Sequence, residues 1–233
     1  MKWESPLEEA ILQNRYKRFL ADIQLKGEAL TVHVPNTGAM TSCWAPGWTC
    51  AVSKAQNPDR KLPYTLELIH NGETWIGVNT NLANKLAHEW LKAEALPTLA
   101  GYKLIQPEKK LDSKTRFDFY LEGHATLPPC YVEVKNVTLK LDGKAAFPDA
   151  VSERGQKHLR ELITLKKSGL RAVMLYVVAR EDVIEFIPAK TIDPRYAELL
   201  QEAQESGVEI LVVQCRMGLQ ELGLGKVLPF TLN

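Results

Sequence analysis

The hydrophobic pattern changes near residue 81, and this change constrains the fold more than any other feature of the chain. Before it, short segments rich in β-branched and aromatic residues alternate with turn sequences, which is typical of β-strands. The last two segments flank Asn71-Gly72, a strong hairpin signal. The five predicted strands cover residues 19–25, 29–34, 49–53, 64–69 and 74–78. Five short strands in so short a stretch predict a small closed barrel, and an OB-like β-barrel is the natural candidate.

After residue 81 the apolar residues take up helical spacing, and the chain then alternates helices with strands. Residues 171–180 form a nearly continuous apolar run, which predicts a central strand covered on both faces. A helix over 150–168 is predicted before it, with Asp149 as its N-cap and Gly169 just beyond its end. The other predicted elements are a helix from 81 that ends before Pro97, strands at 99–106, 115–122, 130–139, 183–187 and 208–214, and a helix closed by Gly207. This order predicts an α/β (α+β) domain with a mixed sheet flanked by helices, so we divide the chain into residues 1–80 and 81–233.

The charge balance is nearly even, with 29 basic and 28 acidic residues and a net charge of +1. A general electrostatic DNA-binding protein is usually more basic, but affinity depends on local clusters, so this class is disfavoured without being excluded. The cysteines form no CxxC pair, which argues against a zinc site and favours buried reduced thiols. No apolar run is long enough for a signal peptide or a membrane span, so we expect a soluble, cytoplasmic protein with no membrane partner.

Acidic and basic residues on two neighbouring predicted strands are the sharpest chemical feature. Alternate side chains of a strand share a face, so Glu133 and Lys135 point the same way, opposite to two valines. Asp118, between two phenylalanines, projects away from the apolar face of the preceding strand, and a plausible hairpin register brings it near Glu133. Two carboxylates that hold Mg²⁺ or Mn²⁺ and a lysine that orients the attacking water fit metal-assisted phosphodiester hydrolysis. The alternative is an ordinary solvated strand face.

The start of the helix that follows carries polar residues that could reach the same cleft. A helix N-terminus favours anions, so we predict that Arg154, Gln156 and Lys157 contact phosphate there. Gly155 costs about 1 kcal/mol of helix stability relative to alanine, and a close approach of another backbone would explain it. The alternative is a solvated helix face with a salt bridge between Lys157 and Glu161.

Basic and aromatic residues also interleave at the start of the predicted barrel, where Arg15, Lys17 and Arg18 stand beside Tyr16 and Phe19. This combination suits nucleic acid, because cations neutralise phosphates and rings stack on bases. The alternative is a barrel rim with ordinary core aromatics.

The loop at 35–40 lies further along the predicted barrel. We expect Gly38 there to adopt a positive φ that other residues resist.

Five stretches spread over nearly the whole chain resemble the bacterial sugar fermentation stimulation protein A family. They are residues 15–22, 35–40, 78–80, 131–139 and 147–159. The resemblance implies an OB-like N-terminal domain and a C-terminal restriction-endonuclease-like domain of the PD-(D/E)xK fold. It also implies DNA binding that is not sequence-specific and a regulatory role in sugar (maltose) utilisation.

The resemblance also assigns roles by position. It implies that Asp118 and Glu133 are the metal carboxylates and that Lys135 is the catalytic lysine. Phe117 stands where the superfamily name has proline, a position that is tolerant in such folds.

Two functional hypotheses follow from these residues and from the resemblance. The first is a DNA-binding protein without strong sequence specificity that regulates sugar (maltose) metabolism on a nuclease-type scaffold. The second is a Mg²⁺- or Mn²⁺-dependent nuclease that uses Asp118, Glu133 and Lys135. A pure interaction module is a third, weaker alternative. The sequence does not decide between single- and double-stranded DNA, nor whether the chain forms a homodimer, as many proteins of this fold do.

Overall fold

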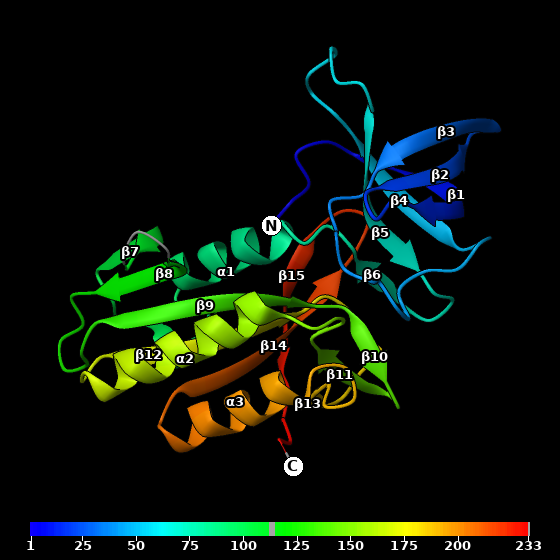
Figure 1. Cartoon of the computed structure of the whole chain (residues 1–233). Helices are drawn as coiled ribbons and strands as arrows, with labels where there is room; N and C mark the ends of the chain where they lie inside the picture. The colour runs from blue at the N-terminus through cyan, green and yellow to red at the C-terminus, as the bar shows by residue number, and fades with distance from the viewer. Residues whose placement is uncertain (112–114, 233) are drawn as a thin grey trace.

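The computed structural model describes residues 1–111 and 115–232, which form a barrel packed against a larger α/β domain (Figure 1). The barrel strands are β1 (Leu7–Tyr16), β2 (Leu20–Leu25), β3 (Glu28–His33), β4 (Thr49–Lys54), β5 (Tyr64–His70) and β6 (Trp75–Gly77). Their order is β3-β2-β1-β4-β5-β6, and a parallel contact between His33 and Thr65 joins β3 to β5. The OB-like fold is therefore confirmed, because strands β1–β5 close into a five-stranded barrel.

The set of five strands differs from the prediction. The structure adds β1, for which no strand was predicted, and leaves β6 outside the closed ring. Only Ala10 and Leu12 of β1 are buried, and the register shifts between Leu12 and Asn14, so the apolar alternation is short and interrupted. A bulged strand with two buried residues gives little period-2 signal.

The second domain is built on a six-stranded mixed sheet in the order β15-β14-β12-β9-β8-β7. Its strands are β7 (Leu104–Lys110), β8 (Arg116–Glu122), β9 (Cys130–Val137), β12 (Arg171–Val178), β14 (Glu209–Met217) and β15 (Leu222–Val227). Every residue of β12 is buried, and this strand pairs in parallel with β9 and β14. The predicted central strand, covered on both faces, is thus confirmed.

Helices cover both faces of this sheet. Helix α1 (Leu82–Lys92) packs on one face, and α2 (Glu153–Lys167) and α3 (Pro194–Glu205) pack on the other (Figure 1). The alternation along β9 supplies both cores, because Val132 and Val134 lie in the α1 core whereas Tyr131 lies in the α2–α3 core. Glu133 and Lys135 therefore face α2, which is how the domain places its polar residues beside a helix.

Several predicted boundaries were wrong. Ser152, not Asp149, is the N-cap of α2, and its side chain accepts a hydrogen bond from the backbone N–H of Gly155. The predicted strand at 99–106 begins only at Leu104, after the short 3₁₀ helix η1 (Pro97–Leu99). The predicted strand at 183–187 pairs with β11 instead of lying beside β12. The strand that pairs with β11 is β13 (Phe186–Pro188). Three further strands were not predicted: β10 (Leu139–Leu141), β11 (Lys144–Phe147) and β15. Strands β10 and β11 are too short for a periodic signal, and β15 contains two glycines, which weaken a strand pattern.

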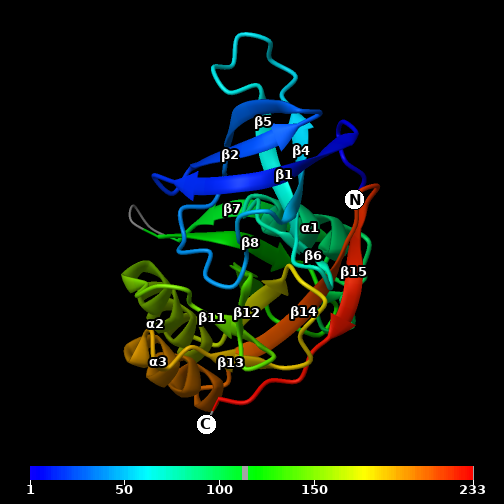
Figure 2. The same ribbon diagram turned by 90° about the vertical axis from the view of Figure 1, so that its right-hand side faces the viewer.

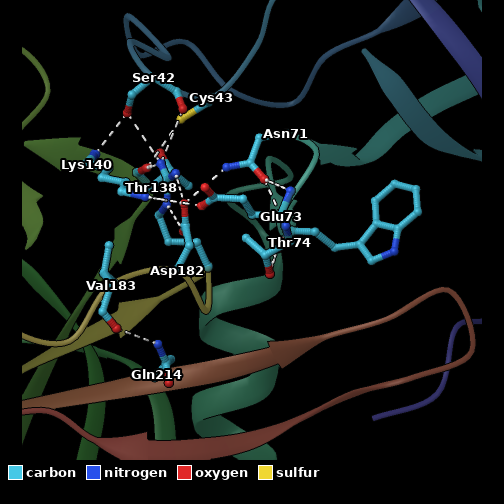
Figure 3. A network of polar contacts seen from close by, with 12 residues as sticks. Ser42, Cys43, Asn71, Glu73, Thr74, Thr138, Lys140, Asp182, Val183 and Gln214 are labelled. Carbon is cyan, nitrogen blue, oxygen red and sulfur yellow. Dashed lines mark hydrogen bonds and ion pairs between the residues drawn. The ribbon is translucent and has the colours of Figure 1, made fainter. Parts of the chain in front are cut away.

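A buried ion cluster joins the barrel to the second domain (Figure 3). Arg180 is 1% exposed, and its guanidinium donates to the carbonyl of Thr138 at 2.8 Å and to Asp182 at 2.7 and 2.8 Å. Asp182 also accepts hydrogen bonds from Asn71 of the barrel at 3.0 Å and from Lys140 at 2.8 Å. Ser42 of the barrel contributes its carbonyl and hydroxyl to Arg180. We call Arg180, Asp182, Lys140, Asn71 and Ser42 the interdomain cluster.

The N-terminal residues also contact the second domain. The amino group of Met1 donates to the carbonyl of Leu222 at 2.8 Å and pairs with Glu89, and Lys2 forms a bridge with Glu221. Figure 2 shows the N-terminus beside β15 and α1. The chain therefore starts on the second domain before it enters the barrel.

All four cysteines, Cys43, Cys50, Cys130 and Cys215, are buried and unpaired. Within the described ranges no helix has the length and apolarity needed to cross a membrane.

Candidate active site

The candidate site forms where β8 and β9 separate. The two strands pair from Leu121↔Cys130 to Phe119↔Val132, and the ladder ends there. One residue further along β8, Oδ2 of Asp118 accepts a hydrogen bond from the backbone N–H of Val134 at 2.7 Å. The carboxylate thus takes the acceptor role that a backbone carbonyl has in the ladder, and this contact brings Asp118 onto β9 beside Glu133.

Glu133 is the buried centre of the site, with only 2% of its surface exposed. Its Oε1 is 2.6 Å from Nζ of Lys135 and also hydrogen-bonds Nδ1 of His158 on α2. Lys135 Nζ lies 3.4 Å from the same imidazole nitrogen. Glu133 Oε2 is buried and has no hydrogen-bond partner among the described residues. One carboxylate oxygen is therefore used within the protein, and the other is a buried acceptor that no described residue uses.

The pKa values of the two carboxyl groups are shifted in opposite directions. Burial, followed by repulsion from Glu133, raises the pKa of Asp118 to about 6. Burial also acts to raise the pKa of Glu133, but the hydrogen bond with His158 and the charge of Lys135 outweigh it, so this pKa is lowered. The pair thus combines a carboxylate that stays ionised with one that is costly to ionise until a cation arrives.

Asn84 and His158 contact the candidate carboxylates, and the sequence analysis did not select either residue. Asn84, on α1, donates from Nδ2 to Oδ1 of Asp118 at 2.7 Å. His158, on α2 at the opposite face of the sheet, hydrogen-bonds Glu133. These contacts orient both carboxylates, and the sequence offered only the presence of His158 within the polar start of α2 as a signal.

A cavity of about 390 Å³ contains this cluster. Its lining includes Asp118, Glu133, Lys135, Asn84, Asn136, Thr80, Asn81, Ser152 and Arg154. A larger cavity of about 470 Å³ is lined by other residues, among them Lys54, Arg60 and Lys85, and no predicted catalytic residue lines it. The predicted catalytic residues therefore line the smaller of these two cavities.

Of the three predicted phosphate contacts on α2, the structure brings one to the cavity. Arg154 is exposed and lines it. Gln156 instead donates to Asp193, the N-cap of α3, at 3.0 Å. Lys157 pairs with Glu161 at 3.5 Å, as the alternative interpretation of this helix face expected. Successive residues of a helix point about 100° apart, so these three side chains cannot all face one cleft.

Gly155 is explained by helix packing. A Cβ there would lie 2.8 Å from Oγ of Ser152 and 3.0 Å from a ring carbon of Tyr196 on α3. The close approach comes from the N-cap serine and from Tyr196 of the neighbouring helix α3.

Of the three basic residues predicted to bind nucleic acid in the barrel, one is used within the protein and two face solvent. The guanidinium of Arg15 donates to the carbonyls of Arg18, Gly38, Asn36 and Ala39, at 2.6, 2.9, 3.0 and 3.3 Å. Lys17 and Arg18 form the exposed turn between β1 and β2, and Phe19 next to them is 48% exposed. Arg15 therefore holds the loop at 36–39, while Lys17 and Arg18 face solvent.

The predicted reason for Gly38 was wrong. Its φ is not positive, but a Cβ there would overlap Oδ2 of Asp149 and lie 3.0 Å from Oδ1 of Asn36. The glycine allows the barrel loop to approach the second domain closely.

The residues of the site fit a hard divalent cation. Two carboxylates on adjacent strands reach one cavity, and the orphaned Oε2 of Glu133 supplies an unused acceptor. The described residues contain no group of three or more His, Cys, Asp or Glu side chains placed to hold a metal. Mg²⁺ commonly takes only one or two carboxylates and keeps several waters, so two are enough for this ion.

Comparisons with known proteins agree with this architecture. The family model described as the sugar fermentation stimulation protein RE domain matches residues 81–221, and the SfsA N-terminal OB domain matches residues 14–78. The chain is 46% identical to a sugar fermentation stimulation protein homolog of Geobacter sp. (strain M21) over 233 residues, all of both chains. It is 45% identical to the homolog of Geotalea daltonii over 228 residues, which are 97% of this chain and 98% of that one.

A solved structure is also similar over the whole chain. The structure of Pyrococcus furiosus SfsA in complex with Ca²⁺ is 31% identical in sequence, with a TM-score of 0.89 over 99% of this chain and 98% of that one. Both domains, their order and the full-length similarity therefore place this chain in the sugar fermentation stimulation protein family.

Proposed function

We propose that this protein binds DNA without strong sequence specificity and hydrolyses its phosphodiester bonds with the help of Mg²⁺ or Mn²⁺. The observation that carries the proposal is the cavity in which Asp118, Glu133 and Lys135 meet around a buried carboxylate oxygen without a partner among the described residues. The alternative interpretation, an ordinary solvated strand face, would not bury Glu133 in this way.

Asp118 and Glu133 are the residues that would hold the cation. When bound, such an ion acidifies the attacking water and neutralises charge on the phosphate. The relative from Pyrococcus furiosus was solved with Ca²⁺, which like Mg²⁺ prefers oxygen ligands, and this supports a divalent cation here. Asn84 and the N–H of Val134 fix Asp118, and each of its oxygens keeps a further lone pair for a ligand.

Lys135 and Arg154 supply the positive charge for the phosphate. The ammonium of Lys135 lies 2.6 Å from Glu133, where it can orient a water and stabilise negative charge on the phosphoryl oxygens. His158 holds the carboxylate of Glu133 by hydrogen bonding the same Oε1. Arg154 stands at the cavity wall with an exposed guanidinium suited to bidentate phosphate contact. Lys17 and Arg18, exposed at the turn between β1 and β2, are further candidates for phosphate contact.

Labelled single-stranded, duplex and branched DNA, each incubated with Mg²⁺, with Mn²⁺ and with chelator, test the proposal. We expect metal-dependent cleavage that Glu133→Ala lowers on the order of 10³-fold, because removing a metal ligand costs several kcal/mol of transition-state stabilisation. Glu202→Ala, on the exposed side of α3, is the matched control and should cleave normally.

Binding is measured by gel shift in chelator with the same three proteins. Both variants should bind DNA as the unaltered protein does, with an affinity that falls steeply as salt rises. Cleavage that survives in Glu133→Ala would point to a contaminating nuclease. Gel shifts without cleavage in any protein would favour the alternative, a DNA-binding protein on a nuclease scaffold.

A role in regulating sugar (maltose) metabolism is the other part of the DNA-binding hypothesis, and it rests on the family resemblance alone. We propose it only as a consequence of DNA binding. The four buried, unpaired cysteines support action in the reducing cytoplasm. A homodimer stays a prediction.

A further inference from the structure

A second cavity, of about 230 Å³, opens beside the candidate active site. The two cavities share Thr80 and Asn136 in their linings, so they are adjacent compartments along β9. We call the second one the side pocket. Its lining is Asn36, Thr37, Gly38, Thr80, Asn136, Thr138, Leu139, Ala146, Phe147 and Asp149.

The side pocket presents hydrogen-bonding groups that the protein itself does not use. Asn36 is 5% exposed; its Oδ1 accepts from the N–H of Gly38 at 2.8 Å, while its Nδ2 has no partner among the described residues. The side-chain amide of Asn136 likewise makes no hydrogen bond within the described ranges, and Asp149 uses only Oδ2, which accepts from the N–H of Met40 at 3.3 Å. Both amides are therefore open to a ligand in the pocket and can donate hydrogen bonds to it.

The charge of the pocket selects against phosphate. No lysine or arginine lines it, and its single charged residue is the carboxylate of Asp149. Arg15 lies near enough to Asp149 to interact with it electrostatically, so the pocket is close to neutral and offers a phosphate no cationic side chain in its lining. A neutral group with N–H donors and a carbonyl acceptor fits instead, because the carboxylate accepts and the amides donate.

An aromatic ring forms part of the wall of the pocket. The half-buried ring of Phe147 forms part of the wall and is itself supported by Tyr196, with ring centroids 5.2 Å apart. A volume of about 230 Å³ corresponds to roughly eight waters, which is room for one ring system but not for a base pair.

The barrel holds the loop of this pocket in place. Arg15 donates to three carbonyls of the loop, those of Asn36, Gly38 and Ala39, and Ser42 is tied into the interdomain cluster. Gly38 lets the loop lie against Asp149 without a clash. A pocket supported on both sides binds without first ordering its walls.

From these features we infer that the side pocket binds one unpaired nucleobase, next to the phosphate held in the candidate active site. Guanine fits best, because its N1–H and N2–H₂ groups can donate to Asp149 while O6 accepts from an amide of Asn36 or Asn136. The substrate is then single-stranded DNA or a duplex with one nucleotide turned out of the stack. As a statement about the substrate, the inference rests on the proposed nuclease function.

DNA binding measured without metal tests the base pocket separately from the proposed nuclease activity. Fluorescence anisotropy in chelator would compare labelled thymidine oligonucleotides that carry one central guanine, adenine or abasic residue. We expect the guanine strand to bind about 10-fold more tightly than the abasic strand, the size of one stacked base. Asp149→Asn should remove most of this difference, since the amide that replaces the carboxylate can still accept from Met40 but has lost one acceptor. Asp142→Asn, in the exposed turn between β10 and β11, is the matched control and should leave the difference unchanged.

Guanosine 5′-monophosphate and maltose serve as competitors. Competition by the nucleotide alone supports the inference, whereas displacement by maltose alone would assign the pocket to a sugar and overturn it. Equal affinity for guanine and abasic strands, or an unchanged preference in a folded Asp149→Asn protein, would also overturn it.

If no DNA is cleaved but the guanine preference depends on Asp149, the base pocket stands and the nuclease proposal fails. If DNA is cleaved equally with and without a guanine beside the cut, the nuclease stands and the pocket fails.

Discussion

The second domain contains two buried clusters of charged residues, the interdomain cluster and the candidate active site. Their carboxylates differ in hydrogen-bond partners and in pKa. In the interdomain cluster, Asp182 accepts hydrogen bonds from Arg180, Lys140 and Asn71. Burial acts to raise the pKa of Asp182, but these hydrogen bonds outweigh it and hold the pKa well below its ordinary value. In the candidate active site, burial raises the pKa of Asp118 to about 6, and Glu133 keeps one oxygen without a partner among the described residues.

The difference teaches how to separate a structural ion cluster from a functional one. A cluster that joins two domains satisfies its own charges, because an unpaired buried charge would cost several kcal/mol. A cluster that receives a cation has to leave acceptors unused, and the protein bears that cost until the ligand arrives. The four predictions below would break or sharpen this distinction.

The largest effect is expected from Asp182→Ala. The substitution leaves the guanidinium of Arg180 buried without its counter-ion, which should lower the free energy of unfolding by about 3 to 5 kcal/mol. Urea unfolding followed by circular dichroism measures this, with the exposed Asp142→Ala as control. A loss under about 1 kcal/mol would show that the interdomain cluster is not the structural joint we take it to be.

Asp118→Asn should raise the free energy of unfolding instead of lowering it. Ionised Asp118 is disfavoured by burial and by Glu133, so a neutral amide should stabilise the metal-free protein at neutral pH by about 1 to 3 kcal/mol. Asn84 can turn its amide to accept from the new side chain, which keeps the local hydrogen bonds. Thermal unfolding in chelator measures the gain, and Mg²⁺ or Mn²⁺ should then stabilise the unaltered protein but not the variant. Lower stability of the variant in chelator would mean that Asp118 serves the fold.

The pH dependence follows from the direction of the Asp118 shift. Between its ordinary pKa of 3.8 and its value of about 6 in the folded protein, the folded state binds more protons than the unfolded state. The contribution of this group to stability therefore falls as pH rises through that window, and the advantage of Asp118→Asn should grow from pH 4 to 6 and then level off. Because a cation needs the ionised carboxylate, metal binding to the unaltered protein should weaken below about pH 6. Unfolding series at several pH values, with and without metal, test both trends.

The smallest effect concerns two basic residues three positions apart on α2. Arg154 lines the cavity, whereas Lys157 is paired with Glu161. Arg154→Ala should weaken DNA binding several-fold and reduce the slope of its salt dependence by about 1, as for one lost phosphate contact. Lys157→Ala should change both less. Anisotropy titrations over a range of salt concentrations measure the slopes, and equal effects would show that the nucleic acid extends along α2.

Much of the site was readable from local patterns. The two-residue period of a strand placed Glu133 and Lys135 on one face, and Asp118 was recognised as a polar residue between two core phenylalanines. The buried run at 171–180 identified the central strand, and turn residues marked four of the five barrel strands. These features depend on near neighbours in the chain, which is why periodicity detects them.

What the sequence left open depends on partners far apart in the chain. Asn84 meets Asp118 across 34 residues, His158 meets Glu133 across 25, and Gln156 meets Asp193 across 37. Similarly, the barrel loop carrying Asn36 closes the side pocket against residues of the second domain.

Sequence by itself determined the two-domain architecture, the strand that carries the acids and the lysine, and the family of the chain. Only the tertiary structure decided which polar groups are used internally and which remain for a ligand. Arg15 and Arg154 are the same residue type, yet the guanidinium of one binds four backbone carbonyls and that of the other lines the cavity. The period of an element fixes the face on which a side chain lies, but its hydrogen-bond partners depend on how separate elements pack.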